Sequence, residues 1–194
     1  GGVKLTGALD AFAFDPAGHV AADFGASTGG FTDCLLQRGA TRVYAIDVGY
    51  GQLHQKLRDD PRVVNMERVN ARHLLAGALP EPVSLIVIDA SFIGLEKLLP
   101  AAHALLCDGG DVLAMVKPQF QVGRDQLGKG GVVRDPALRA AAVEAVASAA
   151  KALGFSERGR VDAPIKGPKG NQEAFLWLVK TGSTPGIERA PDEA

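Results

Sequence analysis

The chain has 194 residues, a length that suits one α/β domain with a full core. No apolar run approaches the roughly 20 residues that span a bilayer, and no signal peptide is visible. The net charge of −1 excludes a protein that coats RNA over its whole surface, so any nucleic-acid site is expected to be a local basic patch. Two cysteines in apolar contexts, Cys34 and Cys107, predict buried reduced thiols, and these features together predict a cytoplasmic protein.

Apolar and helical segments alternate along the chain. Several apolar segments are continuous runs, as at 85–88 and 112–116, which is typical of central parallel strands covered on both faces. The alternation predicts a doubly wound α/β sheet of seven strands with helices on both faces. Strands are expected at 20–24, 42–46, 62–66, 83–89, 111–116, 155–161 and 174–180. Helices are expected at 5–14, 30–38, 52–58, 71–78, 95–106 and 135–153.

The last part of the chain follows a different pattern. The connection 162–172 holds two prolines and two glycines and has no helical periodicity. Short links of this kind join antiparallel neighbours, so we expect a mostly parallel sheet whose last strand is antiparallel. Residues 1–181 are expected to form the domain, and 182–194 are expected to be a flexible tail.

A glycine turn joins the first strand to the second helix. Residues 23–31 read Asp-Phe-Gly-Ala-Ser-Thr-Gly-Gly-Phe, and glycines there let a ligand lie against main-chain N–H groups. Asp47 ends the next apolar run, where nucleotide-binding sheets place a carboxylate for ribose hydroxyls. The pattern predicts a cofactor that contains a nucleoside, although a turn without a ligand remains an alternative.

The spacing of the glycines favours one kind of cofactor over another. A dinucleotide fingerprint requires Gly-x-Gly-x-x-Gly, but here Ser27 occupies the place of the second glycine. The acidic Asp23 before the turn would repel a pyrophosphate and suits a cationic ligand. S-adenosyl-L-methionine is cationic and has no phosphate, so a methyltransferase is favoured over a NAD-dependent dehydrogenase.

The longest stretch without a helix or strand pattern is 117–134. It leaves the carboxyl end of a central strand, where open α/β sheets place their active sites, and loops of this length are usually functional. Its basic side chains suit a lid that contacts the phosphates of a polyanion, with a solvated loop as the alternative. The expected RNA-binding residues are Arg124, Lys129 and Arg134 of this loop, with Lys166 and Lys169 of the connection 162–172.

Four ionisable residues lie at the ends of predicted elements. Asp89 and Lys117 follow apolar strands, Glu173 opens the last strand, and Lys4 lies just before the first predicted helix. Lys117 is the most informative, because a lysine directly after five apolar residues costs desolvation unless it is paired. Two lysines and two carboxylates around one pocket would favour the neutral form of the lysine that serves as a base.

These motifs resemble those of one known family. The segments that carry the resemblance are 1–5, 23–34, 43–52, 69–72, 88–92, 116–120, 128–135 and 170–175. Together they resemble the methyltransferase domain of the TlyA (hemolysin A) family, relatives of the FtsJ-type ribose methyltransferases, over nearly all of 1–181. The resemblance implies a Rossmann-like class I methyltransferase fold and S-adenosylmethionine-dependent 2′-O-methylation of cytidine in small- and large-subunit ribosomal RNA. It also implies sensitivity of ribosomes to capreomycin-type antibiotics, and an N-terminal S4-like RNA-binding domain that this sequence lacks.

The resemblance assigns roles to individual residues. Its Lys-Asp-Lys-Glu tetrad falls on Lys4, Asp89, Lys117 and Glu173. We expect Lys117 to be the general base, positioned by Asp89 and Lys4, with Glu173 holding the lysine pair. The expected cofactor-binding residues are Asp23, Gly25, Ala26, Ser27, Thr28, Gly29, Gly30, Phe31, Asp47, Val48, Asn70, Ala71 and Asp89. Among them Asp23 is expected near the methionine ammonium and Asn70 near the adenine, although Asn70 could equally cap the following helix.

Three other readings remain beside the methyltransferase. They are a NAD-dependent dehydrogenase, a non-catalytic RNA- or ribosome-binding module, and a membrane-active hemolysin. The tetrad argues against a module that only binds, and the absence of a spanning segment or a cationic amphipathic helix argues against membrane activity. No metal is expected, because the four histidines are scattered at no ligand spacing.

Overall fold

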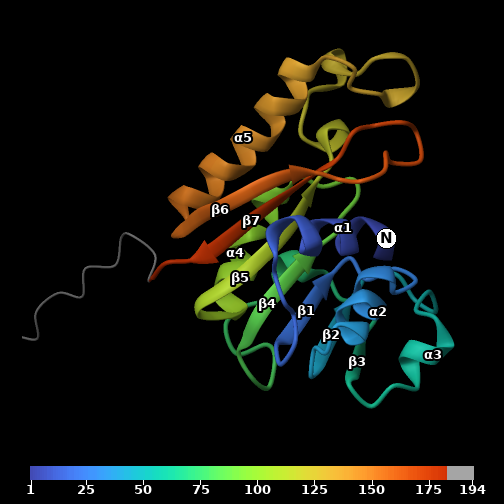
Figure 1. The fold of residues 1–194 in the computed structure, drawn as a ribbon, viewed down its shortest axis with the longest axis vertical. Helices are drawn as coiled ribbons and strands as arrows, with labels where there is room; N and C mark the ends of the chain where they lie inside the picture. The colour runs from blue at the N-terminus through green and yellow to red at the C-terminus, as the bar shows by residue number, and fades with distance from the viewer. Residues whose placement is uncertain (183–194) are drawn as a thin grey trace, which may run out of the picture.

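In the computed structural model, which describes residues 1–182, the domain is built on a seven-stranded sheet (Figure 1). The order across the sheet is β3-β2-β1-β4-β5-β7-β6. The strands are β1 (Val20–Phe24), β2 (Arg42–Ile46), β3 (Val63–Met66), β4 (Val83–Ile88), β5 (Leu106–Val116), β6 (Phe155–Asp162) and β7 (Ala174–Lys180). Of the expected tail, 183–194 lie outside the described residues.

The strand directions confirm the expected mixed sheet. Neighbours from β3 through β5 pair in parallel, whereas β7 pairs antiparallel with both β5 and β6. Val116 at the end of β5 is in register with Ala174 at the start of β7. The amino end of β7 therefore lies at the same edge of the sheet as the carboxyl ends of β1, β4 and β5.

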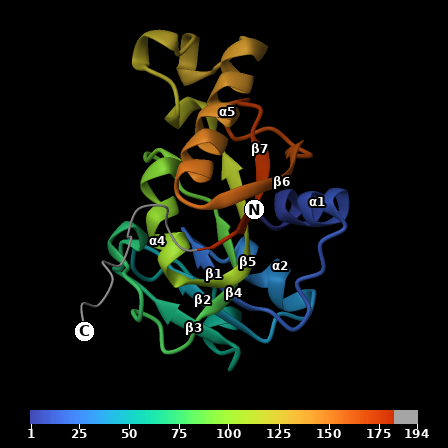
Figure 2. The ribbon, with the colours of Figure 1, turned by 90° about the vertical axis from the view of Figure 1, so that its left-hand side faces the viewer.

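Helices cover both faces of the sheet, as Figure 2 shows. On one face α1 (Gly2–Phe12) and α2 (Gly30–Gln37) pack through Leu5, Leu9 and Leu35 against the inward residues of β4 and β5. On the other face α4 (Leu99–Leu105) and α5 (Pro136–Ala152) pack through Leu99 and Val146. A short α3 (Gln55–Arg58) lies beside β3. The two apolar clusters bury the central strands on both sides, as their continuous apolar runs predict.

Several predicted boundaries are wrong, and the reasons are local. The helix expected over 71–78 is a single 3₁₀ turn, Ala71–His73, because Leu74 is already extended and Gly77 adopts a left-handed φ of 84°. The helix expected over 95–106 divides into a 3₁₀ turn, Leu95–Lys97, and α4, and β5 begins at Leu106 rather than at 111. The first helix begins at Gly2 and ends at Phe12, where Ala13 is left-handed. The helix expected over 52–58 covers only Gln55–Arg58.

The long loop after β5 is more ordered than predicted. It contains three 3₁₀ turns, Pro118–Phe120, Arg124–Gln126 and Lys129–Gly131. It ends at α5, whose amino terminus is capped by the Asp135 side chain accepting from Ala137 N at 2.9 Å, with proline in the first turn. The loop and the β6–β7 connection extend beyond the same edge of the sheet (Figure 1).

Candidate active site

The glycine turn after β1 brings the main chain close to the end of β4. Gly25 has a φ of 85°, and a Cβ at this position would overlap the carbonyl oxygen of Asp89. The N–H groups of Gly25 and Ala26 both donate to Ile46 O, at 2.9 and 3.0 Å. Only glycine fits here, so the turn presents bare backbone between the ends of β1, β2 and β4.

Asp47, which directly follows β2, stabilises the glycine turn through hydrogen bonds. Its Oδ2 accepts from Ser27 N and its Oδ1 accepts from Gly49 N, both at 2.8 Å. Ser27 is left-handed with a φ of 52°, which the first of these bonds helps to hold. A carboxylate has about four acceptor sites, so Asp47 keeps acceptor capacity for a ligand hydroxyl.

A cavity of about 400 Å³ opens beside this turn. Its wall contains seven of the predicted cofactor residues: Gly25, Ser27, Asp47, Val48, Asn70, Ala71 and Asp89. Of the described residues that line it, two are carboxylates and none is lysine or arginine. A pyrophosphate would find no cation on this wall, whereas a cationic ligand would find two anions. The cavity therefore favours S-adenosylmethionine over a dinucleotide.

Nine further residues of the cavity wall, most of them apolar, were not among the predicted cofactor residues. Further lining residues are Phe24, Ile46, Gln52, Val69, Ala90, Ser91, Phe92, Ile93 and Leu98. The segment 90–93 follows β4 at the same edge of the sheet as the glycine turn. This position after a buried strand is the sequence signal that could have predicted these residues as part of the site. Asn70 lines the cavity, and its side chain also caps the following 3₁₀ turn by accepting from Arg72 N at 3.1 Å.

The other predicted cofactor residues lie off the cavity wall, where several have packing roles. A Cβ at Gly29 would overlap the Leu57 side chain, and one at Gly30 would lie 3.0 Å from Gly2 N. Phe31 is buried, with its ring centroid 6.1 Å from that of Phe175. Ala26 is also buried, and Thr28 accepts from His54 N through its carbonyl. The second half of the glycine motif thus packs α2 against its neighbours.

Asp23 is fully buried behind the turn. Its Oδ2 accepts from Thr32 Oγ1 at 2.8 Å, and its Oδ1 has no hydrogen-bond partner among the described residues. Burial, opposed by the Thr32 bond and supported by the charges of Asp89 and Asp47, raises the pKa of Asp23 from 3.8 to about 7. A cation bound in the adjacent cavity would favour the ionised form of this carboxyl.

The four predicted catalytic residues form two ion pairs. Lys4 Nζ lies 2.5 Å from Glu173 Oε1, and Lys117 Nζ lies 2.6 Å from Asp89 Oδ1. Lys117 also donates to Ser91 Oγ at 3.0 Å, and its contact with Asp89 is an ion pair that lacks hydrogen-bond geometry. Within residues 1–182 no ion pair joins Glu173 to Lys117, so the expectation that Glu173 holds both lysines is replaced by one carboxylate for each lysine.

The sheet topology brings these pairs to one edge. Asp89 and Lys117 follow the carboxyl ends of the parallel strands β4 and β5. Glu173 precedes β7, which runs the opposite way, and α1 carries Lys4 over the same edge. Glu173 is 1% exposed and the Lys4 side chain 12% exposed, so this pair is largely removed from water. Asp89 belongs both to a pair and to the cavity wall, which makes the two parts one site.

All five predicted RNA-binding residues are exposed near this edge. Arg124, Lys129, Arg134, Lys166 and Lys169 make no ion pair with any residue in 1–182. Arg134 Nη1 donates to Lys129 O at 3.3 Å, so these two belong to one compact turn. These basic side chains are thus exposed and without an ion-pair partner in 1–182, which is compatible with the local basic patch that was predicted.

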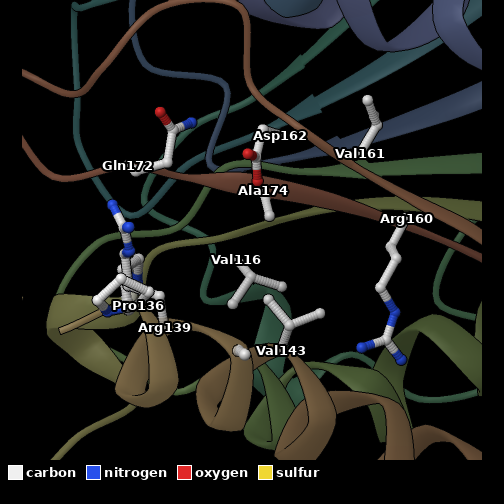
Figure 3. Close-up of a pocket in the computed structure, with 11 residues that line it drawn as sticks. Val116, Pro136, Arg139, Val143, Arg160, Val161, Asp162, Gln172 and Ala174 are labelled. Carbon is white, nitrogen blue, oxygen red and sulfur yellow. The ribbon is translucent and has the colours of Figure 1, made fainter.

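A second cavity, of about 360 Å³, lies between α5 and the β6–β7 hairpin (Figure 3). Val116 and Val143 line it, with Arg139 and Arg160 at opposite ends. Arg160 is already paired with Glu144 and Glu157. None of the predicted site residues lines this cavity, and the carboxylates that suit the cofactor lie elsewhere, so we assign the cofactor to the cavity beside Gly25.

No group of three or more His, Cys, Asp or Glu side chains within 1–182 is placed to hold a metal ion. In the same part of the chain, none of the helices combines the length and apolar character that crossing a membrane requires.

Comparison with known proteins identifies the family. Residues 1–180 match the model of the FtsJ-like methyltransferases. The chain belongs to the FtsJ-like methyltransferase family. It is 54% identical over 178 residues to the 16S/23S rRNA (cytidine-2′-O)-methyltransferase TlyA of Mycobacterium tuberculosis, a match that covers 92% of this chain and 66% of that protein. It is 42% identical over 179 residues to hemolysin A of Brachyspira hyodysenteriae, covering 92% and 75%.

Solved structures agree with this assignment. A structure from Streptococcus thermophilus, named as a hemolysin candidate, has a TM-score of 0.91 and 45% identity, covering 94% of this chain and 66% of that one. The N-methyltransferase NodS of Bradyrhizobium japonicum, solved with S-adenosyl-L-homocysteine, has a TM-score of 0.64 at 14% identity, covering 91% and 85%. The first confirms the family resemblance, and the second supports the Rossmann-like methyltransferase fold alone. The chain spans about two thirds of the length of the Mycobacterium relative.

Proposed function

We propose that the protein is an S-adenosylmethionine-dependent 2′-O-ribose methyltransferase that acts on cytidine in ribosomal RNA. The observation that carries the proposal is the arrangement of Lys117–Asp89 and Lys4–Glu173 at one sheet edge, beside a cavity whose described lining residues include two carboxylates and no lysine or arginine. The relatives named as rRNA cytidine-2′-O-methyltransferases support the choice of substrate.

The residues of the cavity fit the cofactor. Gly25 provides bare backbone, Asp47 has acceptor capacity for ribose hydroxyls, and Asn70 with Ala71 lines the side suited to the adenine. Asp23 places a buried carboxyl, with one oxygen unpartnered, behind the turn where a cationic group would lie in front. When bound, S-adenosylmethionine supplies an activated methyl group on a sulfonium.

Lys117 is assigned as the general base. A ribose hydroxyl is a poor nucleophile until its proton is removed. Lys117 accepts that proton after its ammonium, which is paired with Asp89, has released one proton to solvent. Asp89 and Ser91 fix the position of this nitrogen, while Glu173 fixes Lys4 so that its ammonium faces the ribose. Much of the remaining rate enhancement comes from placement, because effective molarities of oriented groups reach on the order of 10⁵ M or more.

The exposed basic residues are assigned to the RNA backbone. Arg124, Lys129 and Arg134 on the loop after β5 and Lys166 and Lys169 on the β6–β7 connection border the catalytic edge. We extend the proposal to substrates from both ribosomal subunits, to assistance from an N-terminal S4-like domain, and to a link with capreomycin-type antibiotics. An rRNA substrate places the enzyme in the cytoplasm, where ribosomes are.

The test measures cofactor binding and methyl transfer separately. Calorimetric titration should show S-adenosylmethionine binding to the wild type and no binding of NAD. Lys117→Ala should abolish transfer of labelled methyl to rRNA while it leaves cofactor affinity nearly unchanged. Lys97→Ala, which removes an exposed lysine from the 3₁₀ turn after β4, is the matched control and should behave as wild type.

The position of the new methyl group tests the reaction itself. Methylated nucleotides should resist alkaline cleavage at the modified position, because the 2′-oxygen that attacks the phosphate is blocked. A fully active Lys117→Ala variant would remove this lysine as the base. Label that is found on a base rather than on a ribose would refute the proposed reaction.

A further inference from the structure

The two basic loops at the catalytic edge meet at one buried amide, that of Asn171. Its Oδ1 accepts from Val133 N at 2.9 Å, and its Nδ2 donates to Gly131 O at 3.1 Å. The residue is 1% exposed and lies in the β6–β7 connection, 38 residues from Val133 along the chain. A side chain from one loop therefore satisfies the backbone of the other.

The segment held by Asn171 is a closed turn. Gly128 N donates to Val132 O at 2.9 Å, and Gly131 N donates to Gly128 O at 3.0 Å. Arg134 Nη1 also reaches back to Lys129 O. Because these bonds tie 128–134 together, fixing Gly131 and Val133 also fixes the backbone that carries Lys129 and Arg134.

The main chain of Asn171 closes the second basic loop in the same way. Its carbonyl accepts from Gly167 N at 2.9 Å, and Gly170 N donates to Gly167 O at 2.9 Å, so 167–171 is a tight turn that carries Lys169. The turn is packed against the carboxylate that pairs with Lys4, since a Cβ at Gly167 would lie 3.0 Å from Glu173 Oε1. Asn171 itself precedes Glu173 by two residues.

The Asn171 amide meets both demands of the partner loop. An N–H donor and a C=O acceptor point at the same buried side chain, which must therefore offer one acceptor and one donor. The partners also fix the orientation of the amide, with oxygen toward Val133 N and nitrogen toward Gly131 O. An ionised aspartate could accept but not donate, and alanine would leave both backbone groups unpaired.

We propose that Asn171 is a positioning residue that fixes both basic loops, and with them the RNA backbone, relative to the Lys4–Glu173 pair. The inference rests on the proposed RNA substrate. Phosphate contacts set the register of a nucleic acid on a protein, and here the groups suited to those contacts are locked to the strand that delivers a catalytic carboxylate. Asn171 acts through the loops and touches neither cavity nor reacting atoms.

The test compares Asn171→Ala and Asn171→Asp with Gln172→Ala. Gln172 is the matched control, because its Nε2 also makes two hydrogen bonds to carbonyls, Ala163 O and Glu173 O, but none to 128–134. Both Asn171 variants should raise the KM for RNA about tenfold or more and change kcat less. The dissociation constant for S-adenosylmethionine should be unchanged, because Asn171 does not line its cavity. Should Asn171→Ala fail to fold, the isosteric Asn171→Asp still decides.

A double-mutant cycle separates positioning from general stability. In a protein that already carries Lys129→Gln and Arg134→Gln, Asn171→Ala should have little further effect on the KM for RNA, because the groups it positions are gone. The inference would be refuted if the effects of these substitutions on the KM for RNA were fully additive. It would also be refuted if the Asn171 variants lost cofactor affinity in proportion to their loss of thermal stability. So would wild-type behaviour of the Asn171 variants in a system where the wild type methylates RNA. A wild type that binds cofactor but methylates no RNA refutes the proposed function instead.

Discussion

Replacing Asp23 by asparagine should remove most of one pH-dependent component of stability. The native carboxyl is fully buried and its pKa is raised to about 7 from 3.8. Asparagine has nearly the same shape, keeps an oxygen to accept from Thr32, and carries no proton that titrates in this range. The variant therefore isolates the free energy of ionising this one buried group.

The sign follows from proton binding in the two states. Between about pH 4 and pH 7 the folded protein keeps the Asp23 proton, while the unfolded chain has released it, so stability falls as pH rises through this window. Above about pH 7 both states are ionised and the loss is complete. At about 1.4 kcal/mol for each pKa unit, the difference between 3.8 and about 7 corresponds to about 4 kcal/mol.

Urea unfolding at pH 5 and pH 8, followed by circular dichroism, measures the effect. The stability of Asp23→Asn relative to wild type should increase by about 2 to 3 kcal/mol from pH 5 to pH 8, because about two of the three pKa units lie between these values and other titrating groups cancel in this difference. Asp33→Asn is the control, since that carboxylate lies on α2, is partly exposed and, within residues 1–182, accepts only from Gln37. A relative stability that is the same at both pH values would refute the reasoning.

Three further predictions concern the cofactor and the RNA. Gly25→Ala should abolish cofactor binding in calorimetry and lower the free energy of unfolding by about 2 kcal/mol or more, because its Cβ would overlap Asp89 O; normal binding would mean that the turn can shift. Asp47→Ala should weaken cofactor affinity about 10- to 100-fold through the lost ribose acceptor and the lost brace on Ser27, and unchanged affinity would exclude that contact. Neutralising Arg124, Lys129 and Arg134 together should reduce the slope of log K against log salt for RNA by about 2, and an unchanged slope would exclude the loop as the RNA contact.

The fold could be predicted from sequence where burial dictates pattern. The runs at β1, β2 and β7 have the predicted bounds, because continuous apolar segments between glycine and proline signals leave few alternatives. The bounds of the short helices could not be predicted as well. The 71–78 segment was predicted as a helix, but Leu74 is already extended and Gly77 is left-handed, so only one 3₁₀ turn forms. Strand β5 is longer than its apolar run, because pairing with Val83 extends it through Gly109 and Gly110.

The predicted cofactor residues fall into two groups, those that line the cavity and those that pack against other elements. Gly25, Ser27 and Asp47 could be predicted to face a ligand because the motif places them at strand ends, and they line the cavity. Gly29, Gly30 and Phe31 belong to the same motif, yet their small size or apolar character serves packing between α2, α3 and α1. A glycine motif does not by itself distinguish backbone that approaches a ligand from backbone that approaches another helix.

Pairing within the tetrad depends on topology that no local pattern contains. Lys4 and Glu173 are 169 residues apart, and they meet because β7 enters the sheet between β5 and β6 in the antiparallel sense. In a sheet whose strands were all parallel, the residue before β7 would lie at the opposite edge, far from Asp89 and Lys117. The antiparallel strand thus lets a strand start, rather than a strand end, contribute a carboxylate to the active edge. The same reversal places the β6–β7 turn with Lys169 beside the loop after β5, so the one topological feature that completes the tetrad also joins the two basic loops at Asn171.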